Sequence, residues 1–140
     1  FETRCDEISE ITFEDIDIIY VNGACMSIHL GDRAYVHDIN YKDIRIETSK
    51  GPFIEYFIKE TQYTQDNIRG KISDVSIEGV VINGDAIGRI IFEGYDSSHN
   101  ISNVSIGTIK FNNRELKDIS TMLGKVTYAT NIKYNGKTVK

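Results

Sequence analysis

Residues 36–46 read Val-His-Asp-Ile-Asn-Tyr-Lys-Asp-Ile-Arg-Ile, and this stretch decides the fold. Its apolar residues stand at offsets 0, 3, 5, 8 and 10, and every residue between them is polar. At 100° per residue these offsets scatter around a helical wheel, which excludes an amphipathic α-helix. Offsets 3 and 5 alternate as one face of a strand does, and so do offsets 8 and 10. The stretch therefore predicts two strands joined by a bend at offsets 6 and 7.

The same spacing occurs five times, with copies that start at residues 8, 36, 72, 101 and 129. Of its 25 slots 24 are apolar, with Lys137 the exception, whereas Val81 is the one apolar residue at the 30 positions between slots. A repeat of this length indicates a solenoid, whose coils bury their inner faces only by stacking on one another. The first copy fills its slots with Ile8, Ile11, Phe13, Ile16 and Ile18.

A third apolar alternation follows most copies of the repeat. Three strands per coil predict an all-β fold, a right-handed parallel β-helix of about five coils with three parallel sheets, in one domain over residues 1–140. The 36-residue interval between the second and third copies predicts an insertion, which we place within residues 48–69. The expected third strands contain Met26-Ile28-Leu30, Ile54-Tyr56-Ile58, Ile90 with Phe92, and Ile119-Thr121-Leu123.

Offset 2 of the repeat is always acidic or Asn: Glu10, Asp38, Asp74, Asn103 and Asn131. Stacking at a spacing of roughly 4.8 Å would align these side chains as a ladder at a corner of the coil. We expect Asn103 and Asn131 to share an amide hydrogen bond. Asp38 above Asp74 would need solvent or turn N–H groups to offset their repulsion. The ladder is expected to be structural.

The charge and composition exclude several classes of function. The formal net charge is -5, with 21 acidic and 16 basic residues and no basic cluster, which argues against a nucleic-acid partner. No apolar run is long enough to span a bilayer, so no membrane association is expected. Cys5 and Cys25 match no zinc or redox spacing, and no metal or cofactor is predicted. The two cysteines are either plain thiols or a disulfide.

The copies at residues 8–18 and 36–47 resemble the coil repeats of the pectin-lyase-like β-helix superfamily. Within it they are similar to polysaccharide-cleaving glycoside hydrolases, the polygalacturonases of family 28 and the dextranase and isopullulanase group of family 49. The segment Gly94-Tyr-Asp-Ser-Ser-His-Asn-Ile-Ser-Asn-Val104 resembles coil junctions near the C-terminal end of such enzymes. The resemblance implies a polysaccharide or oligosaccharide ligand and a secreted or periplasmic location.

The chain departs from the polygalacturonase pattern where catalysis would lie. It has no Asn-Thr-Asp, Asp-Asp or Gly-His-Gly, and Arg45-Ile46-Glu47 only approaches the family's Arg-Ile-Lys. The resemblance therefore implies the C-terminal coils of a longer hydrolase whose catalytic carboxylates lie upstream of Phe1. The alternative is a noncatalytic β-helix, such as a carbohydrate-binding, surface or tailspike-type module.

Candidate ligand-binding residues lie on the outer face of the third strands and in the loops after them. The strands offer His29, then Glu55 or Phe57, and then Arg89, Ile91 or Glu93. His29 and Asp32 could act as a general acid and its partner, or could be an exposed histidine beside a turn. Aromatic rings in the insertion could form a sugar platform or belong to the core. The predicted substrate-binding set is His29, Asp32, Arg33, Glu55, Tyr56 and Glu93.

Exposed strand edges tend to pair with other strands. If the first copy of the repeat lies at an open end of the stack, end-to-end self-association of the coil edges is expected. Lys137 breaks the inward pattern in the fifth copy, which predicts that the regular stacking stops there.

Overall fold

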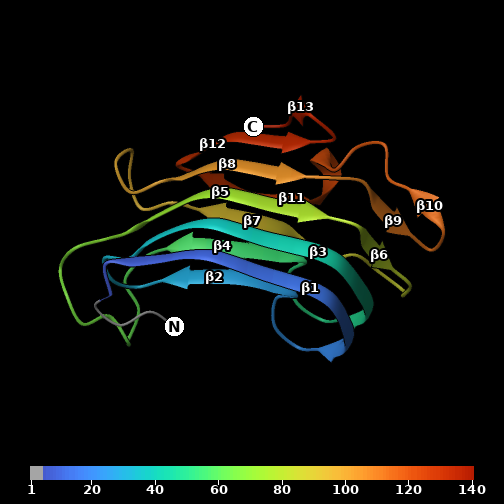
Figure 1. Cartoon of the computed structure of the whole chain (residues 1–140), viewed down its shortest axis with the longest axis horizontal. Coiled ribbons are helices and arrows are strands. Elements are labelled where there is room, and N and C mark those ends of the chain that lie inside the picture. Colours follow the sequence, from blue (N-terminus) through green and yellow to red (C-terminus); the bar gives the residue numbers. More distant parts are fainter. Residues whose placement is uncertain (1–4) are drawn as a thin grey trace.

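The computed structural model describes residues 5–140 and is all-β, with its strands in two sheets (Figure 1). A short 3-10 helix, Ser120–Met122, precedes β11. The four-stranded sheet contains β2 (Met26–Leu30), β4 (Ile54–Ile58), β7 (Ile90–Glu93) and β11 (Leu123–Thr127). The nine-stranded sheet contains β1 (Glu7–Val21), β3 (Tyr35–Ser49), β5 (Lys71–Glu78), β6 (Val80–Ile82), β8 (Ile101–Ile106), β9 (Ile109–Phe111), β10 (Arg114–Glu115), β12 (Ala129–Tyr134) and β13 (Lys137–Thr138).

The copies of the repeat stack as parallel strands in the predicted register. Val36 pairs with Ile8 on one side and with Ile72 on the other, and the ladder continues through Ile101 to Ala129. Each slot of the first three copies therefore lies beside the same slot of the next copy, and the first three slots of the fourth copy lie beside those of the fifth. β13 instead runs antiparallel to β12, which agrees with the expected end of regular stacking at the fifth copy.

The prediction of three parallel sheets is wrong, because the described strands form two sheets. β1 and β3 each run for 15 residues through the expected bend, so both halves of the repeat belong to one sheet. The bend is present as a residue of positive φ at offset 7, with Asp15 at 57°, Asp43 at 54° and Gly79 at 67°. A left-handed residue reverses the alternation of side chains as a β-bulge does, without ending the ladder. Offset 8 thus points inward again within the same sheet.

The offset-2 ladder has the same backbone feature. All five of its residues have positive φ, between 53° and 58°, which Asn and Asp tolerate better than most residues. The expected amide bond is confirmed, since Asn131 Nδ2 donates to Asn103 Oδ1 at 2.7 Å. Asn103 Nδ2 in turn donates to Asp74 Oδ1 at 2.9 Å. The left-handed residue at offset 2 also explains why offsets 0 and 3 both point inward.

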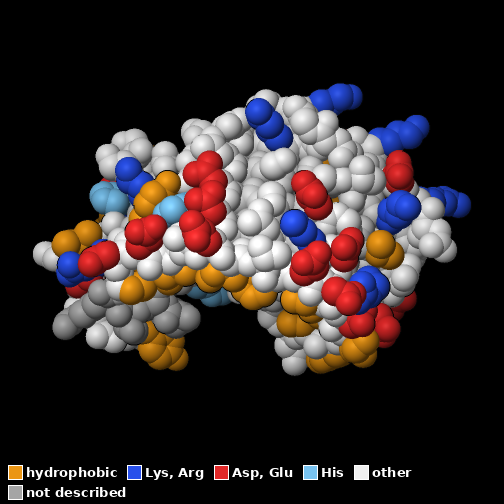
Figure 2. Space-filling model, viewed as in Figure 1, with side chains coloured by type: hydrophobic (Ala, Val, Ile, Leu, Met, Phe, Trp, Pro, Cys, Tyr) orange, Lys and Arg blue, Asp and Glu red, His pale blue; other side chains and the backbone are white. Residues whose placement is uncertain are grey.

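One core fills the space between the two sheets, and it contains nearly all the slots of the second to fourth copies. The first copy is less well covered, because β1 pairs with β3 alone in the described chain. Ile11 is 36% exposed and Phe13 is 40% exposed. Figure 2 shows hydrophobic side chains in a band along the margin of the molecule where β1 lies.

The prediction of a third strand in each coil is correct for β2, β4 and β7 and partly wrong for the last coil. Residues 120–122 form the 3-10 helix, and Leu123 and Val126 of β11 occupy the positions beside Ile90 and Phe92. The inserted residues lie between β4 and β5, where twelve residues (59–70) connect strands that only four (31–34) connect in the preceding coil. Cys5 and Cys25 are both free thiols.

Candidate binding surface on the four-stranded sheet

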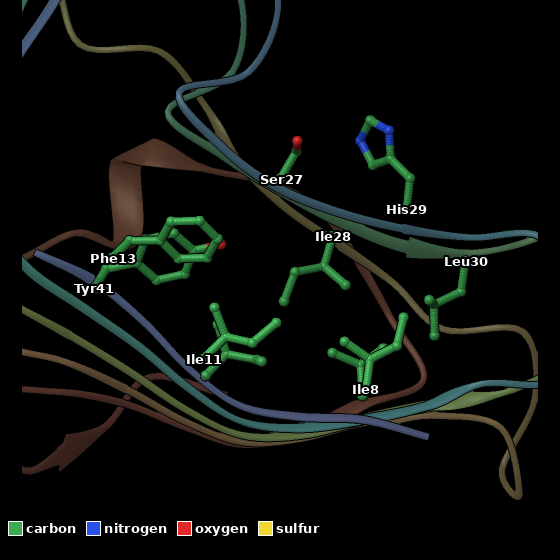
Figure 3. A pocket seen from close by; sticks show the side chains of 10 residues that line it. Ile8, Ile11, Phe13, Ser27, Ile28, His29, Leu30 and Tyr41 are labelled. Carbon is green, nitrogen blue, oxygen red and sulfur yellow. The ribbon is translucent and has the colours of Figure 1, made fainter. Parts of the chain in front are cut away.

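Strand alternation divides the side chains of the four-stranded sheet into an inner and an outer set. In β4, Ile54, Tyr56 and Ile58 are fully buried, while Glu55 and Phe57 lie on the opposite face. Figure 3 shows the same division in β2, where Ser27 and His29 point away from Ile28 and the core. The predicted outward positions are therefore correct for this sheet.

The register brings outward residues from three strands together. His29 pairs with Phe57, and Phe57 pairs with Glu93. Glu55 lies two residues before Phe57 on β4 and pairs with Ser27. His29, Phe57 and Glu93 therefore form a row across β2, β4 and β7, each on the strand next to the previous one. His29 and Glu93 are nevertheless 64 positions apart in the sequence.

His29 is held by two contacts from β4. Its Nε2 is hydrogen bonded to Glu55 Oε2 at 2.9 Å. Its ring stacks on Phe57, with centroids 3.9 Å apart and planes 16° from parallel. Burial lowers the pKa of His29, although Glu55 acts in the opposite direction. His29 is thus biased towards the neutral imidazole, which can both donate and accept a hydrogen bond.

Two lysines complete the surface around Glu93. Lys59 Nζ lies 4.2 Å from the centre of the Phe57 ring and 3.5 Å from Glu93 Oε2. Lys125 Nζ donates to Glu93 Oε1 at 2.5 Å. The hydrogen bond from Lys125 is the main reason that the pKa of Glu93 is lowered, so Glu93 stays ionised. We call His29, Glu55, Phe57, Lys59, Glu93 and Lys125 the outer-face cluster.

Two of the predicted binding residues are buried, and this corrects the prediction for them. Tyr56 is fully buried, and its ring packs 5.4 Å from that of Phe92, so it belongs to the core and offers no face to a sugar. Asp32 is also fully buried, and its Oδ1 accepts the backbone N–H groups of Gln65 and Asp66 at 2.7 and 3.0 Å. Asp32 therefore fixes the 59–70 loop and is not a partner of His29 in acid catalysis.

Arg33 lies apart from the outer-face cluster. Its Nε donates to Asp66 Oδ2 at 2.9 Å, and its side chain lines a separate pocket with Arg69, Lys71 and His99. Of the six predicted residues, the structure therefore brings together His29, Glu55 and Glu93.

Sequence reasoning missed Lys59 and Lys125. Lys59 continues the outward alternation of Glu55 and Phe57 by one step, so extending the strand pattern would have found it. Lys125 lies in β11, whose register is irregular between Leu123 and Val126, and no spacing in the sequence reveals this.

The cluster offers carboxylates, ammonium groups and an imidazole on and beside the strands of the four-stranded sheet. The Cα atoms of Glu55 and Glu93 are diagonal neighbours, about 8 Å apart from strand spacing and rise. Among residues 5–140 no group of three or more His, Cys, Asp or Glu side chains is arranged to hold a metal ion. The described part of the chain also has no helix long and apolar enough to cross a bilayer.

Comparisons of the chain with protein-family models, with curated proteins and with solved structures found no match.

Proposed function

We propose that the chain is a right-handed parallel β-helix of about five coils, with two sheets in place of the three expected. The stacked parallel ladders support this, because each copy of the repeat pairs with the next at an interval of 28 to 36 residues. A strand of the second sheet follows each of the first four copies. Such a stack buries a continuous core that a single coil could not form.

We further propose that the chain is part of a carbohydrate-active protein and that the outer-face cluster binds a polysaccharide or oligosaccharide. The observation that carries this is the row of His29, Phe57 and Glu93 across three strands, with Glu55, Lys59 and Lys125 hydrogen bonded around it. Sugar hydroxyls both donate and accept hydrogen bonds, so a surface with carboxylates, ammonium groups and a neutral imidazole matches them. The His29 side chain is 28% exposed, so part of its ring is within reach of a ligand beside these groups.

The resemblance to glycoside hydrolases of the pectin-lyase-like superfamily supports a hydrolase as the parent activity, in a secreted or periplasmic protein. In this proposal the catalytic carboxylates lie outside residues 1–140, and the outer-face cluster binds substrate without cleaving it. Glu55 and Glu93 are each engaged, by His29 and by the two lysines respectively. A noncatalytic carbohydrate-binding, surface or tailspike-type module is the alternative.

Isothermal titration calorimetry against a panel of neutral and acidic oligosaccharides tests the proposed binding. We expect at least one ligand to bind, and its affinity to fall about tenfold in His29→Ala and in Glu93→Gln, the loss of one hydrogen bond to the ligand in each variant. Glu78→Gln, a change at an exposed carboxylate of the nine-stranded sheet, is the matched control and should bind as the wild type does. No binding across the panel, or equal loss in the control, rejects the proposal.

An assay for newly released reducing ends of the polysaccharide distinguishes a parent glycoside hydrolase from a noncatalytic module. The chain alone should bind without releasing them, whereas a longer protein that carries the upstream coils should cleave the same polysaccharide. Binding by the longer protein without cleavage of any bound polysaccharide would favour the noncatalytic module.

A further inference from the structure

A polar pocket lies at the N-terminal ends of β3, β5 and β8 in the nine-stranded sheet. None of its lining residues belongs to the outer-face cluster. It has a volume of about 420 Å³ and is lined by Arg33, Tyr35, Arg69, Gly70, Lys71 and His99. Tyr35 and Lys71 begin β3 and β5 and are register partners, and His99 precedes β8. The pocket thus spans three neighbouring coils.

The pocket lining contains Arg33, Arg69 and Lys71 and no carboxylate, and the acidic neighbours Asp66, Asp32 and Asp96 lie outside the lining. Arg33 donates to Asp66, and the Arg69 Nη2 lies 3.9 Å from the other oxygen of the same carboxylate. One aspartate is therefore shared by two guanidinium groups. Lys71 has no ion-pair partner within residues 5–140. Asp6 lies 4.0 Å from Arg33, but its side chain is 90% exposed and its attraction is screened by solvent.

Arg69 is the strongest sign of a missing partner. It is 5% exposed, and its Nη1 is buried without a hydrogen bond to any described residue. Its guanidinium lies 5.9 Å from the centre of the Tyr95 ring, a cation–π contact that offsets only part of the cost of burying the charge. Its Nη2 donates to the backbone carbonyl of Asp66, and an anion in the pocket would add a second charged partner to the Asp66 carboxylate 3.9 Å away.

The lining residues suit an oxyanion in particular. A guanidinium presents paired N–H donors that match carboxylate, sulfate and phosphate oxygens. Lys71 adds positive charge, and His99, which is hydrogen bonded to Asp96, adds a polar ring. Gly70 fixes the base of the pocket, because a Cβ on it would come within 1.9 Å of the Ala34 carbonyl oxygen.

We propose that this pocket binds an oxyanion, a carboxylate, sulfate or phosphate group, between Arg33, Arg69 and Lys71. The site is independent of the proposed saccharide binding, because it shares no residue with the outer-face cluster. A ligand that carries such a group could reach it from solvent, since Lys71 is exposed.

The test is an NMR titration of the chain with sodium acetate, sodium sulfate and sodium phosphate, each at constant ionic strength set with sodium chloride. We expect saturable shifts at the amides of Gly70 and Lys71 for at least one oxyanion, and the tightest of the three identifies the group. In Lys71→Gln the dissociation constant should rise about tenfold, the loss of one charge-assisted contact. Because Lys71 is exposed, this variant is expected to fold, whereas Arg69→Gln could unfold the loop.

Lys110→Gln, a change at an exposed lysine of β9, is the matched control and should bind as the wild type does. Shifts that are equal for chloride and all three oxyanions overturn the proposal. So do dissociation constants that are the same in the wild type and in Lys71→Gln. Neutral oligosaccharide binding in Lys71→Gln should be unchanged, which separates failure of this site from failure of the outer-face cluster.

Discussion

Asn103 Nδ2 donates to the Asp74 carboxylate of the neighbouring coil at 2.9 Å, and both residues have positive φ. This pair shows how one position of the repeat performs two tasks. A short polar side chain tolerates the left-handed backbone that turns the next slot inward, and it also links adjacent coils. The hydrogen bonds to Asp74 from Ser73 and Asn103 lower the pKa of its carboxyl, so it is ionised and offers only acceptors.

Because Asn103 has a left-handed backbone conformation, the free energy of unfolding should depend strongly on which residue occupies this position. Asn103→Val should lower the free energy of unfolding by about 1–3 kcal/mol, because a β-branched residue is strained at positive φ. Asn103→Gly loses the same hydrogen bonds but relieves the strain, so it should cost less than Val. Urea denaturation measures both, with Ser102→Val as the control on the same strand. If Gly proves the more damaging of the two, strain at this position is not what selects Asn.

The burial of Tyr56 predicts a structural role for its ring. Tyr56→Ala should reduce the free energy of unfolding by about 3–5 kcal/mol, the usual cost of removing a buried aromatic side chain. Tyr56→Phe should keep most of that stability and leave saccharide affinity unchanged. Chemical denaturation and calorimetry on the Phe variant check this. A loss of saccharide affinity in a stable Tyr56→Phe protein would restore the ring to the binding site.

Two histidines should give stability opposite dependences on pH. Burial lowers the pKa of His29 below its usual 6.5, so the unfolded chain binds the proton more readily and stability falls as pH drops below about 6.5. Hydrogen bonding to Asp38 and then to Glu7 raises the pKa of His37 above 6.5. Its contribution is complete below 6.5 and is lost as pH rises through the raised value.

Thermal unfolding from pH 5 to 8 tests both signs. His29→Gln should reduce the loss of stability towards pH 5, and His37→Gln should reduce the loss towards pH 8. His99, which is hydrogen bonded to Asp96 within its own turn, provides a comparison through His99→Gln. The same change in slope for the His29 and His37 variants would contradict the opposite environments of the two rings.

The uncovered edge of β1 predicts self-association of the chain. Ile11 and Phe13 line an open apolar cavity of about 280 Å³ between β1 and β2, and both strands lie at sheet edges in the described chain. We expect two copies to pair through β1 in antiparallel orientation. Because β1 carries outward acids such as Glu10 and Glu14, added salt should strengthen the pairing by screening their repulsion.

Sedimentation velocity over a range of concentrations measures this association. Phe13→Glu should shift the chain towards monomer, whereas Tyr63→Glu, at an exposed ring of the 59–70 loop, should not. A wild-type chain that stays monomeric at high concentration and high salt would exclude the β1 interface.

The sequence predicted the register of the fold well, because slots such as Val36, Ile72 and Ile101 follow one spacing and stack on one another. It did not predict the number of sheets, since a left-handed residue such as Asp43 bends a strand without ending its ladder. The inward slots have the same spacing whether one bent strand or two separate strands carry them. Only the hydrogen-bonded path through Asp43 distinguishes a bent strand from two strands.

The candidate site was predictable only where strand alternation governs it. His29, Glu55 and Glu93 are outward residues of regular strands, and the structure brings them together. Asp32 resembles an exposed turn carboxylate in the sequence, but the inserted 59–70 loop folds over it and buries it. The shared use of Asp66 by Arg33 and Arg69 depends on that same loop, and no periodicity encodes it.

The most direct test of the central claim is a residue-resolved NMR titration with the oligosaccharide that binds best in calorimetry. We expect the largest amide shifts in β2, β4, β7 and β11, around His29, Phe57, Glu93 and Lys125, and we expect Glu93→Gln to reduce them at equal ligand concentration. Shifts confined to the nine-stranded sheet, or no saturable shift with any oligosaccharide, would contradict a saccharide-binding role for the outer-face cluster.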